Sequence, residues 1–369
     1  MAEKLLVVLF ISMLAIGSIG LLLFPKQSFS PIENRPLEKW PRITPETIIN
    51  KKAMTQFETY LSDHFPYRNG WIKTKAFVEQ VRGRKENNGI YLGRGGYLFE
   101  KIDPTIERQV DRQIREIETF AERYEEKSIE LMLIPPSAIF YEQQWPSFAP
   151  MADLIAMQRT IMNRMSSRVM TYDGARMLEP YREQYIYYKT DHHWTTRGAY
   201  IAYAHYALQQ GWEPINYEPV VVSEQFYGSF DTRGQFIRRE PDRVERPNLN
   251  NESTLYIEDR NELRHTLYDE EALQQKDQYR YFFGGVHAAM QLKTPDAPIE
   301  EPLLVVKDSY AHALLPFLTA HYANIYVLDL RYYNGSVEQY MEDHQIDHIL
   351  LLWNTTTFLE ETQLFKLNR

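Results

Sequence analysis

Two hydrophobic patterns alternate along most of the chain. Ile106, Val110 and Ile114 have helical spacing and follow Asp103, a typical N-cap residue. The unbroken apolar run from Ile129 to Ile134 comes next and predicts a buried strand. The alternation recurs, with helices predicted at 154–165, 196–209, 311–320 and 336–343 and strands at 169–172, 303–306, 325–328 and 349–353. It predicts an α/β fold, a parallel sheet with helices on both faces.

The first apolar stretch has a different character. From Leu5 to Phe24 the chain runs for 20 residues without a charge, and a helix of that length spans about 30 Å, the thickness of a bilayer's hydrocarbon core. We expect residues 1–26 to form an uncleaved transmembrane anchor, because no small-x-small cleavage site follows; a cleaved signal peptide is the alternative. The basic residues after the helix oppose the positive-inside trend, but long domains are translocated largely regardless of flanking charge, so we expect the rest to be extracytoplasmic.

The remainder is predicted to form a linker and one domain. Residues 27–44 are rich in Pro and polar side chains without sustained periodicity, which is typical of a linker. We expect residues 45–369 to form the domain, beginning with helical patterns over 45–63 and 68–82. Between about 211 and 302 the alternation stops, which predicts an inserted irregular region with short strands near 255–257 and 279–283.

Composition narrows the class of protein. With 41 basic and 50 acidic residues the formal net charge is −9, and no Lys/Arg cluster is long enough to follow a phosphate backbone, so nucleic acid is not expected as a partner. The chain has no Cys, which excludes disulfides, thiolate nucleophiles and Cys-ligated zinc. The 26 Tyr residues weakly suggest sugar binding, although most Tyr side chains pack in cores.

Asp191, His192 and His193 concentrate a carboxylate and two imidazoles just before a predicted helix. Asp191 and His193 are two residues apart, so in an extended segment the carboxylate can accept a hydrogen bond from the imidazole, as a Ser-His-Asp system requires. The same residue types are good zinc ligands, and further imidazoles are available at His64, His205, His287 and His312. The residues alone leave the triad and the metal site equally supported, and neither reading needs an organic cofactor.

A nucleophile is available at Ser309, where the predicted strand 303–306 gives way to a helix. Open α/β sheets place reactive groups at such strand ends, and the free N–H groups of Ser309 and Tyr310 are candidate donors to an oxyanion. A Ser before a helix is more often an N-cap, and Asp308 is an equally good cap. Arg331 follows another strand and either lines the same crevice or forms a salt bridge.

These segments and their flanks resemble a known family. It comprises the alginate O-acetyltransferase proteins of AlgJ and AlgX type, and in particular the branch named for its DHHW motif. The matching motifs are Glu33-Asn-Arg-Pro-Leu37, Asp63-His-Phe-Pro-Tyr-Arg68, Gly95-Gly-Tyr-Leu-Phe99, Asp191-His-His-Trp194, Phe226-Tyr-Gly-Ser229, Phe283-Gly-Gly285, Val306-Lys-Asp-Ser-Tyr310, Leu315-Pro-Phe317 and Asp329-Leu-Arg-Tyr-Tyr333.

The resemblance implies an SGNH-hydrolase-like fold and a triad of Ser309 as nucleophile, His193 as base and Asp191 as the residue that orients it. It favours the triad over a metal site. Trp194, Tyr188 and His192 are candidate substrate-binding residues, although burial in the core is the alternative for the aromatic rings. Where this branch tends to carry Asn after the paired Gly, this chain has Val286, so a side-chain donor to the oxyanion is absent from that position.

Two functions follow from the resemblance. The first is an extracytoplasmic O-acetyltransferase or acetylesterase that acts on a cell-surface or secreted polysaccharide through an acetyl-serine intermediate. It implies a membrane-bound O-acyltransferase partner that supplies the acetyl group. The second is a polysaccharide-binding or scaffolding subunit of a biosynthetic complex without turnover, which Val286 favours.

Overall fold

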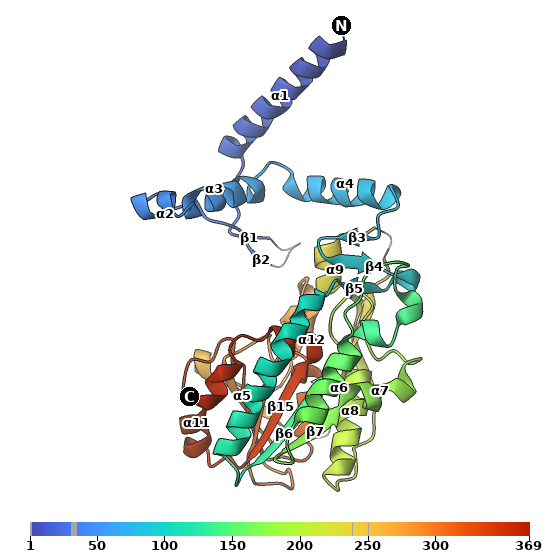
Figure 1. Ribbon diagram of the computed structural model, residues 1–369, viewed down its shortest axis with the longest axis vertical. Coiled ribbons are helices and arrows are strands. Elements are labelled where there is room, and N and C mark those ends of the chain that lie inside the picture. Colours follow the sequence, from blue (N-terminus) through green and yellow to red (C-terminus); the bar gives the residue numbers. More distant parts are fainter. Residues whose placement is uncertain (1, 31–34, 238, 250) are drawn as a thin grey trace. The chain divides into compact units, whose positions relative to one another are not determined.

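The computed structural model describes residues 2–30, 35–237, 239–249 and 251–369, which fall into two compact units (Figure 1). The first consists of Met1–Asn88 with Thr232–Arg238, and the second of Gly89–Asp231 with Arg239–Arg369. The expected domain boundary was at residue 45, whereas the units divide at residue 88. The helices of residues 45–81 contribute little to a core, since their buried residues are Ala53, Asp63 and Ala76.

The first unit is mainly helical. Its helices are α1 (Ala2–Leu23), α2 (Pro45–Ile49), α3 (Lys52–Asp63) and α4 (Arg68–Val81), and its short strands are β1 (Phe29–Ser30), β2 (Arg35–Pro36) and β3 (Glu86–Asn87). The buried carboxylate of Asp63 accepts hydrogen bonds from the Arg35 guanidinium and from the Glu38 N–H, at 2.8 Å for the latter, and so ties α3 to the segment after α1. By length and composition, α1 can cross a membrane over Lys4–Leu21.

The second unit is built on an eight-stranded sheet with the order β11-β10-β12-β14-β13-β15-β6-β7. Its strands are β6 (Ser128–Ile134), β7 (Val169–Asp173), β10 (Thr254–Ile257), β11 (Glu262–Arg264), β12 (Ala289–Lys293), β13 (Leu303–Lys307), β14 (Asn324–Leu328) and β15 (His348–Asn354). The pairs from β14 through β7 are parallel, and β12, β10 and β11 extend the sheet as antiparallel strands.

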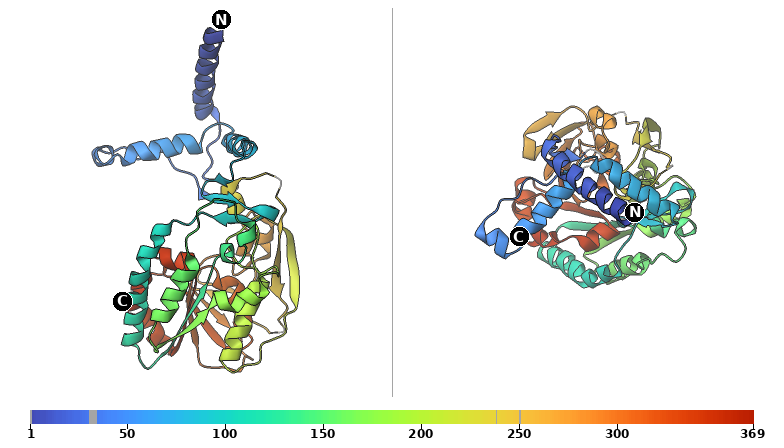
Figure 2. Two further views of the ribbon diagram at one scale, coloured as in Figure 1. Left: turned by 45° about the vertical axis from the view of Figure 1, so that its right-hand side comes forward. Right: turned by 90° about the horizontal axis from the view of Figure 1, so that it is seen from above.

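Helices cover both faces of this sheet, which Figures 1 and 2 show between two helical layers. One face packs on α5 (Val110–Arg123), α6 (Leu154–Arg164), α11 (Val337–Asp343) and α12 (Thr355–Glu360), and the other on α7 (Gly174–Leu178), α8 (Thr196–Gln209) and α10 (Ala311–Leu318). Side chains of β13 alternate between the two cores, with Val305 in one and Val306 in the other, as the pleat requires. The remaining strands are β4 (Ile90–Leu92), β5 (Leu98–Glu100), β8 (Pro219–Phe226) and β9 (Asp242–Pro247), and the remaining described α-helix is α9 (Ser229–Gly234).

The predicted α/β architecture is therefore confirmed, with one exception in the inserted region. The aromatic run at 279–283 is a 3₁₀ helix over Gln278–Tyr281 and not a strand. Phe283, Gly284 and Gly285 all have positive φ, which an extended strand does not allow. The strand lies at Ala289–Lys293 instead, and through it the inserted region joins the main sheet.

Candidate active site

Ser309 lies in the turn between β13 and α10, at the carboxyl end of a central strand. β13 ends at Lys307 and α10 begins at Ala311. The Asp308 carboxylate holds this turn in place, because it accepts the N–H of Tyr310 at 2.8 Å and the N–H of Asn354, at the end of β15, at 2.9 Å. The serine is thus held where parallel sheets leave a crevice for ligands.

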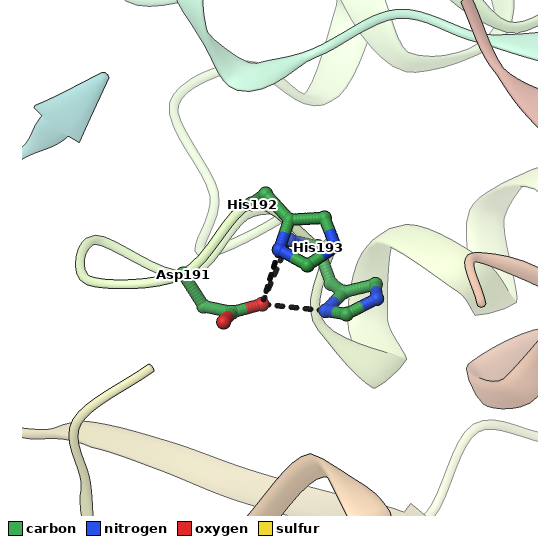
Figure 3. A group of neighbouring side chains, drawn as sticks. All are labelled: Asp191, His192 and His193. Carbon is green, nitrogen blue, oxygen red and sulfur yellow. Dashed lines mark hydrogen bonds and ion pairs between the residues drawn. The ribbon is translucent and has the colours of Figure 1, made fainter. Parts of the chain in front are cut away.

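Asp191, His192 and His193 lie in a loop that a single antiparallel bridge between Tyr187 and Trp194 closes. The Asp191 carboxylate accepts a hydrogen bond from the backbone N–H of His193 at 3.0 Å. This bond forms a local turn that brings the carboxylate beside the imidazole of His193. Figure 3 shows both imidazoles directed at this one carboxylate. The loop therefore places a carboxylate beside an imidazole from positions two residues apart.

A continuous series of hydrogen bonds joins this loop to the serine. The Asp191 carboxylate lies 2.5 Å from His193 Nδ1, and His193 Nε2 lies 2.7 Å from Ser309 Oγ. The second oxygen of Asp191 accepts the N–H of Ser229 at 2.6 Å. The structure thus brings together three predicted site residues from positions that are 116 residues apart in sequence.

The charge of Asp191 is stabilised despite its burial. Burial alone would raise the pKa of its carboxyl, but the neighbouring His192 and His193 and the hydrogen bond from Ser229 hold that pKa well below its usual range. Desolvation by its close neighbours, His193 among them, lowers the pKa of His192 although part of its side chain is exposed. His192 is therefore a neutral imidazole near neutral pH, and its Nδ1 lies 2.7 Å from the Ser229 hydroxyl.

Aromatic side chains hold the histidine and the serine turn together. The Tyr279 ring stacks on the His193 imidazole with centroids 3.6 Å apart, and its hydroxyl donates to the Ser309 carbonyl at 3.1 Å. Trp194 Nε1 donates to the Tyr310 carbonyl at 2.9 Å, and the Tyr310 hydroxyl donates to the His192 carbonyl. The positioning roles of the Tyr279 ring, the Tyr310 hydroxyl and Ser229 were not predicted from the sequence.

Two predicted sugar-binding residues are unavailable to a ligand. The side chains of Trp194 and Tyr188 are fully buried, and the Trp194 indole is committed to Tyr310. The expectation that these rings stack on a sugar is wrong for this structure, because core packing covers both faces. His192, by contrast, is 37% exposed and adjoins a cavity of about 50 Å³ beside Phe230 and Tyr310.

The two backbone N–H groups that were expected to stabilise an oxyanion differ in whether they are already hydrogen-bonded. Within the described residues the N–H of Ser309 has no hydrogen-bond partner. The N–H of Tyr310 donates to the Asp308 carboxylate and so is not free for an oxyanion. The prediction for Tyr310 is therefore wrong, because the side chain that stabilises the turn occupies its donor.

A second group of charges lies beneath the serine turn. The buried Lys307 ammonium donates to Asp329 at 3.2 Å and to His312 Nε2 at 3.0 Å, and Arg331 closes on Asp329 with a contact of 2.6 Å. Burial lowers the pKa of Lys307, whereas the paired cations hold that of Asp329 down. Of the two alternatives for Arg331, the structure shows the salt bridge.

The metal alternative fits this geometry less well. The ligand atoms of Asp191, His192 and His193 lie within 4.8 Å of one another. Two ligands on a tetrahedral zinc are separated by about 3.4 Å, because each bond is about 2.1 Å long. The 2.5 Å from Asp191 to His193 Nδ1 is a hydrogen-bond distance, and His193 Nε2 faces Ser309. The cluster contains no other described histidine.

Several known proteins share features of this chain. A family model described as DHHW protein matches residues 150–328, which contain both segments of the site. A DHHW family protein from Eubacterium siraeum is 21% identical with a TM-score of 0.64, over 77% of this chain and 96% of that one. Bacillus cereus PatB1 is 19% identical with a TM-score of 0.65, over 75% of this chain and 98% of that one.

The structure of PatB1 with a sulfonyl adduct is 18% identical with a TM-score of 0.61, over 75% of this chain and 99% of that one. No curated protein sequence matches the chain. At these identities the structural likeness concerns the fold. Together with the family match it confirms the predicted resemblance to the DHHW branch.

Proposed function

Given the match to the DHHW family model, we propose that this chain is a serine-dependent acyl-transfer enzyme that moves or removes O-acetyl groups on a polysaccharide outside the cytoplasm. One observation carries the proposal: the hydrogen-bonded series from Asp191 through His193 to Ser309. A carboxylate that fixes the imidazole tautomer and an imidazole that faces a hydroxyl are the parts that activate a serine nucleophile.

In the first half-reaction, Ser309 Oγ attacks the carbonyl carbon of an acetyl ester and its proton passes to His193 Nε2. The new C–O bond leaves a negative charge on the carbonyl oxygen, to which the free Ser309 N–H can donate. As the tetrahedral intermediate collapses, the bond to the donor's oxygen breaks and His193 returns the proton to that oxygen. The products are an alcohol and acetyl-Ser309.

In the second half-reaction, a hydroxyl of the acceptor attacks the acetyl-Ser309 carbonyl while His193 takes its proton. Breaking the bond to Ser309 Oγ then regenerates the serine, which receives that proton. With a sugar hydroxyl as acceptor the reaction is transfer, and with water it is hydrolysis.

The location and the partners that we propose rest on the sequence. The apolar helix α1 anchors the chain in a membrane, and the second unit lies on the extracytoplasmic side. A membrane-bound O-acyltransferase supplies acetyl groups to Ser309, and a cell-surface or secreted polysaccharide receives or loses them. The family resemblance supports both partners.

The test is to incubate the full-length chain in detergent with an activated aryl acetate. We expect release of the phenol and an acetylated peptide that contains Ser309, detected by mass spectrometry. We also expect a sulfonyl fluoride to modify the same serine and block the release. A parent protein that hydrolyses no faster than Ser309→Ala and takes up neither reagent would overturn the enzymatic proposal.

The second candidate function is a polysaccharide-binding subunit without turnover. Val286 and the single free N–H at Ser309 favour it, because an oxyanion with one donor is less stabilised than one with two. Binding of bare and acetylated polysaccharide by the parent and by Ser309→Ala, with no reaction in either, is the result that would establish it.

A further inference from the structure

The segment after the apolar helix and the rest of the chain carry opposite net charge. Residues 26–88, which follow the apolar helix, contain 12 Lys and Arg against 7 Asp and Glu, a net charge of +5. Residues 89–369 contain 28 basic and 42 acidic side chains, a net charge of −14. An asymmetry of this size indicates that the first unit meets an anionic partner that the rest of the chain does not.

Helix α4 of the first unit exposes an apolar stripe. Trp71, Phe77, Val78 and Val81 are between 45% and 69% exposed. At 3.6 residues per turn these four positions fall on one side of the helix, and the buried Ala76 falls on the opposite side. A helix of a soluble unit normally turns its apolar stripe inward, so this face is built to be covered by something apolar.

Basic side chains flank the apolar stripe on both sides. Lys73 lies on one side of it along the helix surface, and Lys75 and Arg82 lie on the other. Other exposed apolar side chains of the unit include Trp40, Ile48, Ile49, Met54 and Tyr67. Long basic side chains beside aromatic and aliphatic ones are typical of helices that lie in a membrane interface, where ammonium and guanidinium groups reach the lipid phosphates.

The apolar helix α1 is close to this surface. Gly17 of α1 faces the Phe65 ring and Gly20 faces the Pro66 ring, in the turn between α3 and α4. In an anchored chain, the carboxyl-terminal half of α1 therefore holds α4 within reach of the headgroup layer, so no separate docking event is needed.

We propose that the exposed apolar face of the first unit, namely the stripe on α4 with its flanking basic residues, lies in the interface of an anionic phospholipid bilayer. Charge complementarity selects the lipid, since residues 26–88 carry +5 and phosphatidylglycerol-type headgroups are negative. The inference does not depend on acyl transfer. The proposal also explains why basic residues follow the anchor on its extracytoplasmic side, where the positive-inside trend does not predict them.

The absence of Cys makes a direct test straightforward, because any introduced thiol is unique. Full-length Val78→Cys is labelled with the environment-sensitive fluorophore NBD and reconstituted into vesicles of phosphatidylcholine with phosphatidylglycerol, with or without a doxyl-labelled lipid. The matched control is Leu263→Cys, an exposed apolar position on an edge strand of the second unit. A third variant adds Lys73→Gln, Lys75→Gln and Arg82→Gln to Val78→Cys.

For the Val78 label we expect blue-shifted emission that the doxyl lipid quenches, and for the Leu263 label neither effect. Both effects should weaken in phosphatidylcholine alone and in the variant without the three basic residues. A Val78 label as exposed to water as the Leu263 label overturns the proposal. So does one that is blue-shifted but untouched by the doxyl lipid, which would show that protein covers the stripe.

Discussion

Replacing Gly228 with Ala tests how closely the proposed reaction depends on the Asp191 carboxylate. A Cβ atom at position 228 would lie 2.3 Å from Asp191 Cβ and 2.4 Å from its Oδ2. Carbon atoms pack at about 3.5 Å, so the two groups must separate by about 1 Å. Because Gly228 has no positive φ, the backbone accepts Ala, and the overlap with Asp191 is the main perturbation.

The expected loss of activity follows from this displacement. A shift of about 1 Å breaks the 2.5 Å hydrogen bond from His193 Nδ1 to Asp191. Misplacement on that scale costs about 10²-fold in rate, and loss of the carboxylate's function in a triad costs about 10⁴-fold. We therefore expect turnover to fall by about 10²- to 10⁴-fold, or about 3 to 5 kcal/mol in barrier height.

The assay is aryl acetate hydrolysis by the full-length chain, with circular dichroism to confirm the fold. Gly70→Ala is the control, since a Cβ at that position meets nothing within 4 Å. If Gly228→Ala acts through Asp191, combining it with Asp191→Asn should be no worse than Asp191→Asn alone, because both remove the same interaction. Parental turnover in a folded Gly228→Ala protein would refute the reasoning.

Four further predictions concern the site and its charges. Ser309→Ala should abolish acetyl-enzyme formation and leave the melting temperature within a few degrees, whereas Asp191→Asn should keep a residual rate about 10⁴-fold below the parent, measured by single-turnover mass spectrometry. Hydrolysis should survive a strong chelator, because the proposed triad uses no metal ion; zinc-restored activity after chelation would favour the metal site. Because the pKa of Asp191 is lowered in the folded state, its stabilisation is present above about pH 4 and lost as the pH falls further, so thermal melts of Asp191→Asn should decline less than the parent's in that window. Asp329→Asn, which leaves buried Lys307 without its carboxylate, should cost about 3 to 5 kcal/mol in urea unfolding, whereas Lys307→Met should cost less because Arg331 still pairs with Asp329.

The hydrophobic pattern was sufficient to predict the central elements of the fold. Residues 129–134 and 349–353 form β6 and β15 because buried parallel strands are recognisable as unbroken apolar runs. The antiparallel side of the sheet was harder to predict. β12 at Ala289–Lys293 is short and follows two glycines, whereas the aromatic run before it has strand-like composition but a backbone that turns.

The acid, base and hydroxyl of the site could be proposed from sequence, because a Ser at a strand end and an Asp-x-His segment each have local signals. The supporting contacts could not. The stacking of Tyr279 on His193, and the loss of the Tyr310 N–H to Asp308, depend on side-chain directions that only tertiary packing determines. An aromatic ring such as that of Trp194 can stack on a sugar, and only its burial in the structure shows that it is a core residue.

The position of β15 has a consequence for how the chain is made. β15 is the last strand in sequence, yet it lies between β13 and β6 in the sheet. Until residues 348–354 have emerged, the strand that leads to Ser309 cannot join the β6–β7 half of the sheet, and both halves expose unpaired strand edges that favour aggregation. A nascent chain therefore cannot complete the sheet that positions Ser309 until residues 348–354 have been synthesised.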